Sequence, residues 1–71
     1  MGHTVESELV ANVIAVQVEA GQDIAVGDEL VLLESMKMEI PVVAEHPGRV
    51  AEVKVTVGDV VQDGETLVVL D

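Results

Sequence analysis

Lys37 lies between two methionines, Met36 and Met38, near the middle of a 71-residue chain. The chain has only three Lys and Arg residues, and the other two are Arg49 and Lys54. A lysine ε-amine on an exposed turn is accessible to an enzyme, and methionine side chains offer soft, adaptable apolar contacts on either side. The residue types around Lys37 therefore argue against an ordinary surface lysine.

The Lys37 segment separates two apolar runs, residues 30–33 and 40–43, so the chain is expected to turn there. A two-residue hairpin of type I′ needs positive φ at both central positions, which Asn-Gly or Asp-Gly normally supplies. Met36 and Lys37 supply neither, and positive φ costs a non-glycine residue roughly 1–2 kcal/mol. A turn built from residues that disfavour its backbone conformation, with no evident gain in stability, suggests that the residues are present for a function. We predict that the turn exists to present Lys37.

The chain contains an internal repeat, because residues 1–34 align without a gap on residues 38–71. The matched positions include Val13 on Val50, Val16 on Val53, Val18 on Val55, Gly21 on Gly58, Ile24 on Val61, Gly27 on Gly64, Leu30 on Leu67, Val31 on Val68, Leu33 on Leu70 and Glu34 on Asp71. Lys37 falls at the junction of the two halves. We therefore predict that Lys37 lies at the pole of the molecule opposite the chain termini.

Each half is expected to form four short β-strands, because valine is abundant and Gly and Asp punctuate the apolar runs. The predicted strands cover residues 5–9, 13–18, a short strand about 24, 29–34, 38–44, 50–55, a short strand about 61, and 66–71. A half of this size cannot bury its own apolar face, so the halves must pack together about a pseudo-twofold axis. The predicted fold is all-β: a single domain, residues 1–71, forming a flattened eight-stranded antiparallel barrel or sandwich.

Composition excludes several classes of function. The formal net charge of −11 argues against binding nucleic acid or an anionic membrane, because both require clustered Lys and Arg. The chain has no cysteine, which gives no support to an oxidising compartment, and it has no apolar run of membrane-spanning length. We expect a monomeric cytoplasmic protein without nucleic-acid or membrane partners.

The sequence gives little support for catalysis or for metal binding. His3 and His46 are the only histidines, and they share no metal-ligand spacing. His46 precedes Pro-Gly and is interpreted as a turn residue, while Ser35 has no neighbouring base and no glycine elbow. We therefore predict neither catalytic residues nor a metal site.

The hexapeptide at residues 34–39, Glu-Ser-Met-Lys-Met-Glu, resembles the attachment motif of the biotinyl domains found in biotin carboxyl carrier proteins. The likeness covers nearly the whole chain, because the second half also carries Gly48-x-Val50 and Gly58-Asp59-x-Val61-x-x-Gly64. The resemblance implies the flattened barrel already predicted. It also implies a freestanding single-domain member of the biotin/lipoyl attachment family.

The resemblance implies that biotin protein ligase joins biotin covalently to Lys37. Met36 and Met38 match the flanking methionines that contribute to the turn and to ligase recognition, and Glu34, Ser35 and Glu39 complete the motif. The attached biotin would carry a carboxyl group from a biotin carboxylase to a carboxyltransferase. The domain itself would be a carrier without catalysis, and its benefit would be a high effective concentration of the cofactor.

Ser35 stands where alanine is commoner in the motif, and no insertion is available to encode the protruding thumb of some acetyl-CoA carboxylase carriers. Two alternatives remain. A lipoyl domain also modifies a hairpin lysine, but within Asp-Lys-Ala rather than Met-Lys-Met, and a small attachment protein could accept both cofactors. An unmodified interaction module would bind a partner through its acidic faces, and replacement of Lys37 would leave that binding intact.

Overall fold

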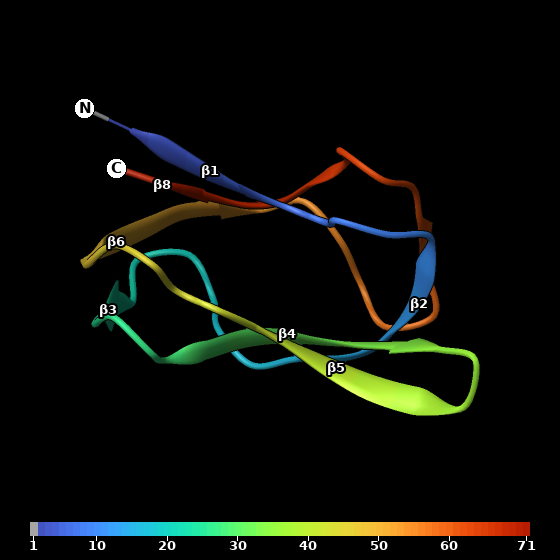
Figure 1. Cartoon of the computed structure of the whole chain (residues 1–71). Coiled ribbons are helices and arrows are strands. Elements are labelled where there is room, and N and C mark those ends of the chain that lie inside the picture. Colours follow the sequence, from blue (N-terminus) through green and yellow to red (C-terminus); the bar gives the residue numbers. More distant parts are fainter. Residues whose placement is uncertain (1) are drawn as a thin grey trace.

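The computed structural model describes residues 2–71, so Met1, the first residue of the predicted repeat, lies outside the described residues. The described chain consists of two facing four-stranded antiparallel sheets (Figure 1). The strands are β1 (His3–Glu6), β2 (Ala11–Val16), β3 (Asp23–Ile24), β4 (Glu29–Ser35), β5 (Met38–Val43), β6 (Gly48–Val53), β7 (Val60–Val61) and β8 (Thr66–Leu70). Within residues 2–71 there is no helix of the length and apolarity that crossing a bilayer requires.

The two sheets interleave the two halves of the sequence. One sheet has the order β1-β8-β6-β3 and the other has the order β5-β4-β2-β7, so each sheet takes strands from both halves. Replacing every strand by its repeat counterpart (β1 by β5, β2 by β6, β3 by β7, β4 by β8) converts one order into the other. Neither half therefore has a core of its own, because its strands are divided between the two layers.

Equivalent hydrogen bonds recur in both halves. Val13 N donates to Asp59 O at 2.8 Å, and the equivalent Val50 N donates to Gln22 O at the same distance. Strand irregularities recur as well, because β2 shifts register after Val13 against β4 and β6 shifts register after Val50 against β8. These paired contacts confirm the predicted pseudo-twofold relation between the halves.

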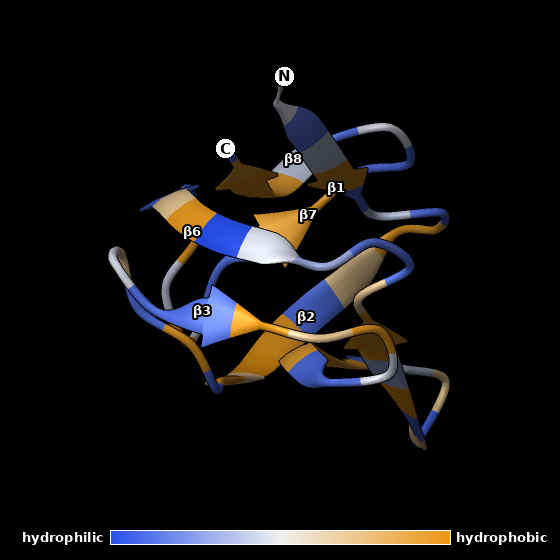
Figure 2. Cartoon of the chain, turned by 90° about the vertical axis from the view of Figure 1, so that its left-hand side faces the viewer, coloured by the Kyte–Doolittle hydropathy of each residue, from blue (hydrophilic) through white to orange (hydrophobic). Residues whose placement is uncertain are grey.

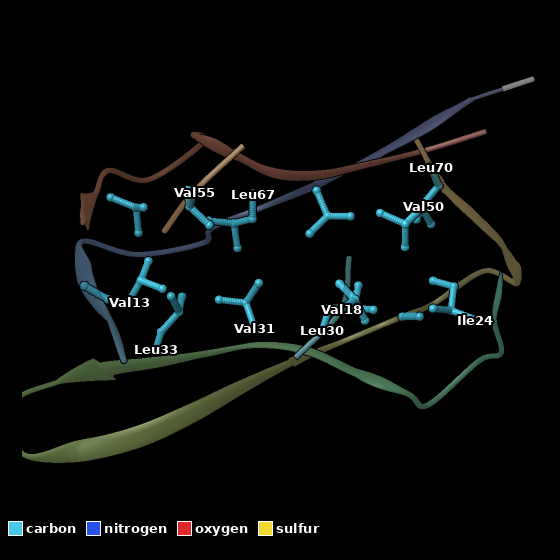
Figure 3. Close-up of a cluster of buried hydrophobic side chains, with 14 residues drawn as sticks. Val13, Val18, Ile24, Leu30, Val31, Leu33, Val50, Val55, Leu67 and Leu70 are labelled. Carbon is cyan, nitrogen blue, oxygen red and sulfur yellow. The ribbon is translucent and has the colours of Figure 1, made fainter. Parts of the chain in front are cut away.

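The core lies between the two sheets and consists of aliphatic side chains (Figure 3). Leu30, Val31 and Leu33 in β4 are fully buried, whereas Leu32 is half-buried. The buried hydrophobic residues are Ala11, Val13, Val18, Ile24, Leu30, Val31, Leu33, Ala44, Val50, Val55, Val61, Leu67, Val68 and Leu70. A thin core without aromatic residues holds the sheets close together.

Several predicted strand limits were wrong. Strands predicted at 13–18 and 50–55 occur as β2 and β6, two residues earlier at each end. The apolar and polar residues alternate through Val16-Gln17-Val18 and Val53-Lys54-Val55, which is typical of a strand, but Val18 and Val55 are buried after the chain has left the strand. The strand predicted at 5–9 is β1, which ends at Glu6 because Ser7 turns the chain and its Oγ donates to Leu9 O at 2.6 Å.

The two sheets do not close into a barrel, so of the two architectures predicted the flattened sandwich is the one observed. β1 and β5 are edge strands of their sheets, and so are β3 and β7. The short β3 and β7 strands and the irregular pairing of β1 and β5 limit the exposed edges, as natural edge strands commonly do.

Candidate functional site: a lysine at a hairpin tip

Lys37 occupies the tip of the β4–β5 hairpin. Ser35 pairs with Met38, so the loop contains only Met36 and Lys37. Their φ angles are 53° and 65°, as the type I′ turn requires, and this confirms the turn expected from the sequence. The hairpin and the chain ends lie at opposite ends of the molecule, as the repeat predicted (Figure 1).

The hairpin is anchored through its inner strand. β4 lies between β5 and β2 and pairs with both, so its backbone is bonded on either side. Leu33, fully buried in the core, lies only four residues before Lys37. The tip is therefore a short extension of a strand that is well anchored in its sheet. Lys37 projects beyond the core of the sandwich from this anchored strand.

The side chains at the tip face solvent. Lys37 is exposed, Met36 is 88% exposed and Met38 is 61% exposed. Met36 is the most exposed of the large hydrophobic residues among residues 2–71, and with Met38 it places two flexible apolar side chains on either side of one amine. The two methionines form an adaptable apolar surface around the amine, and an enzyme could bind this surface while it reacts with the amine.

Glu34, Ser35 and Glu39 lie directly behind the tip. Glu34 in β4 is paired with Glu39 in β5, so two carboxylates occupy opposite positions on adjacent strands. Like charges in that arrangement destabilise a sheet, which again indicates a use beyond folding. Ser35 is half-buried and has no side-chain hydrogen bond among residues 2–71 that would activate it as a nucleophile.

The structure brings the two histidines together, which their sequence spacing did not suggest. His3 in β1 and His46 in the β5–β6 connection stack with ring centroids 4.3 Å apart and planes 7° apart. They contribute to a groove of 630 Å³ between β1 and β5, and Lys37 is not among its lining residues. Parallel rings cannot both direct a nitrogen lone pair at one ion, so the stack is a packing contact across the open edge.

These features together define a class of protein: a small β-sandwich that holds an accessible lysine on a two-residue hairpin at one end. A family model described as "Biotin-requiring enzyme" matches residues 1–70. The chain therefore belongs to the biotin/lipoyl attachment family.

Individual relatives agree with this assignment. The chain is 53% identical over 70 residues to a "Biotinylated protein TB7.3 homolog" of Mycobacterium leprae, covering 99% of each chain. It is 48% identical over 67 residues to a "Biotin/lipoyl attachment protein" of Bacillus subtilis, covering 94% of this chain and 92% of that one. A solved structure of a single-chain, multi-domain long-chain acyl-CoA carboxylase matches with a TM-score of 0.89 and 37% identity, over 96% of this chain but 7% of the carboxylase.

Proposed function

We propose that Lys37 is the covalent attachment point for biotin and that biotin protein ligase loads it. The carboxylate of biotin would first attack the α-phosphorus of ATP, which forms biotinyl-adenylate and releases pyrophosphate. The uncharged Lys37 Nζ then attacks the carbonyl carbon, an amide bond forms, the bond to AMP breaks, and the lysine proton goes to solvent. The observation that carries the proposal is the placement of an exposed lysine at a strained hairpin tip whose residues are poor choices for a turn.

The loaded domain then acts as a carrier rather than as a catalyst. Lys37 at the hairpin tip would hold the biotin and present it to a biotin carboxylase and to a carboxyltransferase, and the bound group would supply a ureido nitrogen that can carry a carboxyl group between them. The likeness to one part of a long-chain acyl-CoA carboxylase supports this role. The cysteine-free composition is consistent with a cytoplasmic setting, where disulfides are rare.

The neighbours of Lys37 have separate parts in this proposal. Met36 and Met38 provide the apolar contacts that the ligase covers during acylation. Glu34, Ser35 and Glu39 present the strand ends that position the turn, and the two carboxylates give the ligase an acidic feature to recognise. Amide formation removes one positive charge from a chain whose formal charge is already −11.

The test is co-expression with a biotin protein ligase, followed by intact-mass measurement and streptavidin binding. Wild-type protein is expected to gain one biotinyl group, and Lys37→Arg is expected to gain none. Lys54→Arg is the matched control, because it makes the same change at the other lysine and is expected to load like wild type. Streptavidin binding that persists in Lys37→Arg would overturn the assignment of biotin to this residue.

Lipoylation is a second candidate, because the Bacillus subtilis relative carries the name "Biotin/lipoyl attachment protein". The same exposed amine at the hairpin tip could be acylated by lipoic acid through an equivalent activated carboxyl group. Incubation of the unmodified protein with a lipoate ligase, ATP and lipoic acid tests this. A lipoyl adduct on wild type but not on Lys37→Arg would establish lipoylation at this residue, and, together with biotin loading, dual modification. The absence of a lipoyl adduct would exclude this second candidate.

A further inference from the structure

The outer faces of the two sheets form an internal comparison. The pseudo-twofold axis relates outward positions in the strands of one sheet to positions in the other, with equivalent strand pairing. Both members of such a pair have equivalent backbone positions, so the fold places similar requirements on their side chains. A consistent difference in chemistry between the two faces therefore reports something other than the requirements of the fold.

The central rows of the two faces differ in polarity. On the sheet that carries Lys37, Pro41 pairs with Leu32 and Leu32 pairs with Ala15, which makes a row of three apolar side chains. The equivalent row on the other sheet contains Thr4, Val69 and Glu52. Two of the three apolar positions are thus polar or charged in the equivalent place.

The same difference appears at the margins of the faces. Val60 in β7 is 58% exposed, whereas its equivalent in β3, Asp23, forms an ion pair with Arg49 at 3.1 Å. Val43 at the end of β5 is 43% exposed, whereas its equivalent in β1 is Glu6. Figure 2 shows the contrast between the short strands, because β7 is entirely hydrophobic and β3 is half hydrophilic.

We call Ala15, Leu32, Pro41, Val43 and Val60 the lysine-side face, and the five equivalent residues Glu52, Val69, Thr4, Glu6 and Asp23 the opposite face. Carboxylates border the lysine-side face. Toward the hairpin tip, the row next to the central one contains Glu39, Glu34, Asn12 and Val60, so Val60 lies at the end of an otherwise polar row. At the other margin Glu29 pairs with Val43. An apolar centre with an acidic border is complementary to a protein surface that has an apolar centre and a basic border.

We propose that the lysine-side face is the docking surface for the ligase that acylates Lys37, an inference that rests on the proposed function. Pro41 lies four residues from Lys37, which is about 13 Å along an extended strand. An ordinary interface of roughly 800 Å² per partner, centred near the tip, extends that far. An enzyme that receives the Lys37 side chain therefore covers this face at the same time, and the acidic border is matched by Lys and Arg on the ligase.

The test exchanges residues between the two faces. Ala15→Glu and Val60→Asp each install the residue type found at the equivalent position, Glu52 and Asp23, where the same fold already accepts it. The matched controls Glu52→Ala and Asp23→Val make the reverse exchange on the opposite face. Ligase kinetics with biotin and ATP give kcat and KM for each protein, and amide NMR spectra together with thermal melting verify that each variant is folded.

The Ala15→Glu, Val60→Asp double variant is expected to raise KM about tenfold with kcat unchanged, because it removes binding remote from the reacting amine. The controls are expected to keep the wild-type KM. General charge attraction cannot produce this result, because the double variant adds negative charge, which would strengthen attraction to a basic ligase.

Three outcomes would overturn the proposal. One is a double variant that loads with the wild-type KM, and another is an equal rise in KM for the controls. A third is a wild-type dimer, measured by sedimentation, that the double variant dissociates while loading is unchanged, because the face would then bind a second copy of the chain. Failure of the proposed function is distinct, since wild-type protein itself would then acquire no biotin on Lys37.

Discussion

The β4–β5 and β8–β1 pairs occupy equivalent places in the two sheets, and only the first pair is closed by a turn. Leu33 pairs with Ile40 across the hairpin, and the equivalent Leu70 pairs with His3 where the two ends of the chain run side by side (Figure 1). The registers match although no connecting residues join β8 to β1. Core contacts and strand irregularities therefore set the pairing, and the hairpin turn is free to serve another purpose.

The turns elsewhere in the molecule reinforce this lesson. Gly27 and Gly64 have φ values of 92° and 89°, so glycine occupies both copies of a corner that needs positive φ. The hairpin tip also needs positive φ, yet it contains Met36 and Lys37 and no glycine. Glycine occupies the corners at which only the backbone conformation matters. At the hairpin tip a side chain must be presented, and glycine is absent there although φ is positive.

The largest stability effect is expected from truncating the equivalent leucines beneath the two strand pairs. Leu33→Ala and Leu70→Ala each leave a cavity in a fully packed core and should each lower the free energy of unfolding by about 2–5 kcal/mol. Urea denaturation followed by circular dichroism measures both values. Similar costs would support equal structural roles for the two pairs, and a much smaller cost at Leu33 would contradict the anchoring of the hairpin by the core.

Replacing Met36 and Lys37 together by Asn and Gly separates the turn's structural role from its proposed role in attachment. The change supplies residues that accept positive φ, so the free energy of unfolding should rise by about 1–2 kcal/mol while attachment is lost. Met36→Leu is the control, because it keeps a non-glycine residue and is expected to leave stability near wild type. Unchanged stability in the Asn-Gly variant would show that the native turn is not strained.

A smaller effect is expected from Glu39→Gln, which removes one of the two carboxylates paired across the hairpin. Relief of this repulsion should stabilise the domain by about 0.2–1 kcal/mol at low salt, and the gain should shrink as salt screens the pair. Glu6→Gln is the control, because Glu6 is paired with the uncharged Thr66. A salt-independent gain, or an equal gain in the control, would be inconsistent with repulsion between Glu34 and Glu39.

Local features of the site were predictable because they depend on residues close together in the chain. The two apolar runs on either side of Met36 and Lys37 predict a hairpin, and the lack of turn residues between those runs predicts its strain. The ends of β2 and β6 were mispredicted, because Val18 and Val55 continue the alternating pattern after the chain has left each sheet. Periodicity indicates which side chains are buried, but not which layer buries them.

Contacts between distant residues were beyond sequence reasoning. The His3 and His46 rings meet only because β1 and β5 are both edge strands on the open side of the sandwich. The lysine-side face is equally hidden in the sequence, since Ala15, Leu32, Pro41 and Val60 come from four strands of one sheet. Only strand order and register bring them into one surface.

The amino-acid sequence by itself was enough to establish the repeat, the all-β class and the lysine at the junction, because valine-rich runs, glycine corners and an unusual turn can be recognised without knowing which residues meet in space. Packing of the two layers decided how the halves interleave, which strands form edges and which side chains share the face that leads to Lys37. The physical reason is that a half-length chain cannot bury its own apolar surface. Its strands must be divided between two layers, and the partners that complete each layer come from the other half.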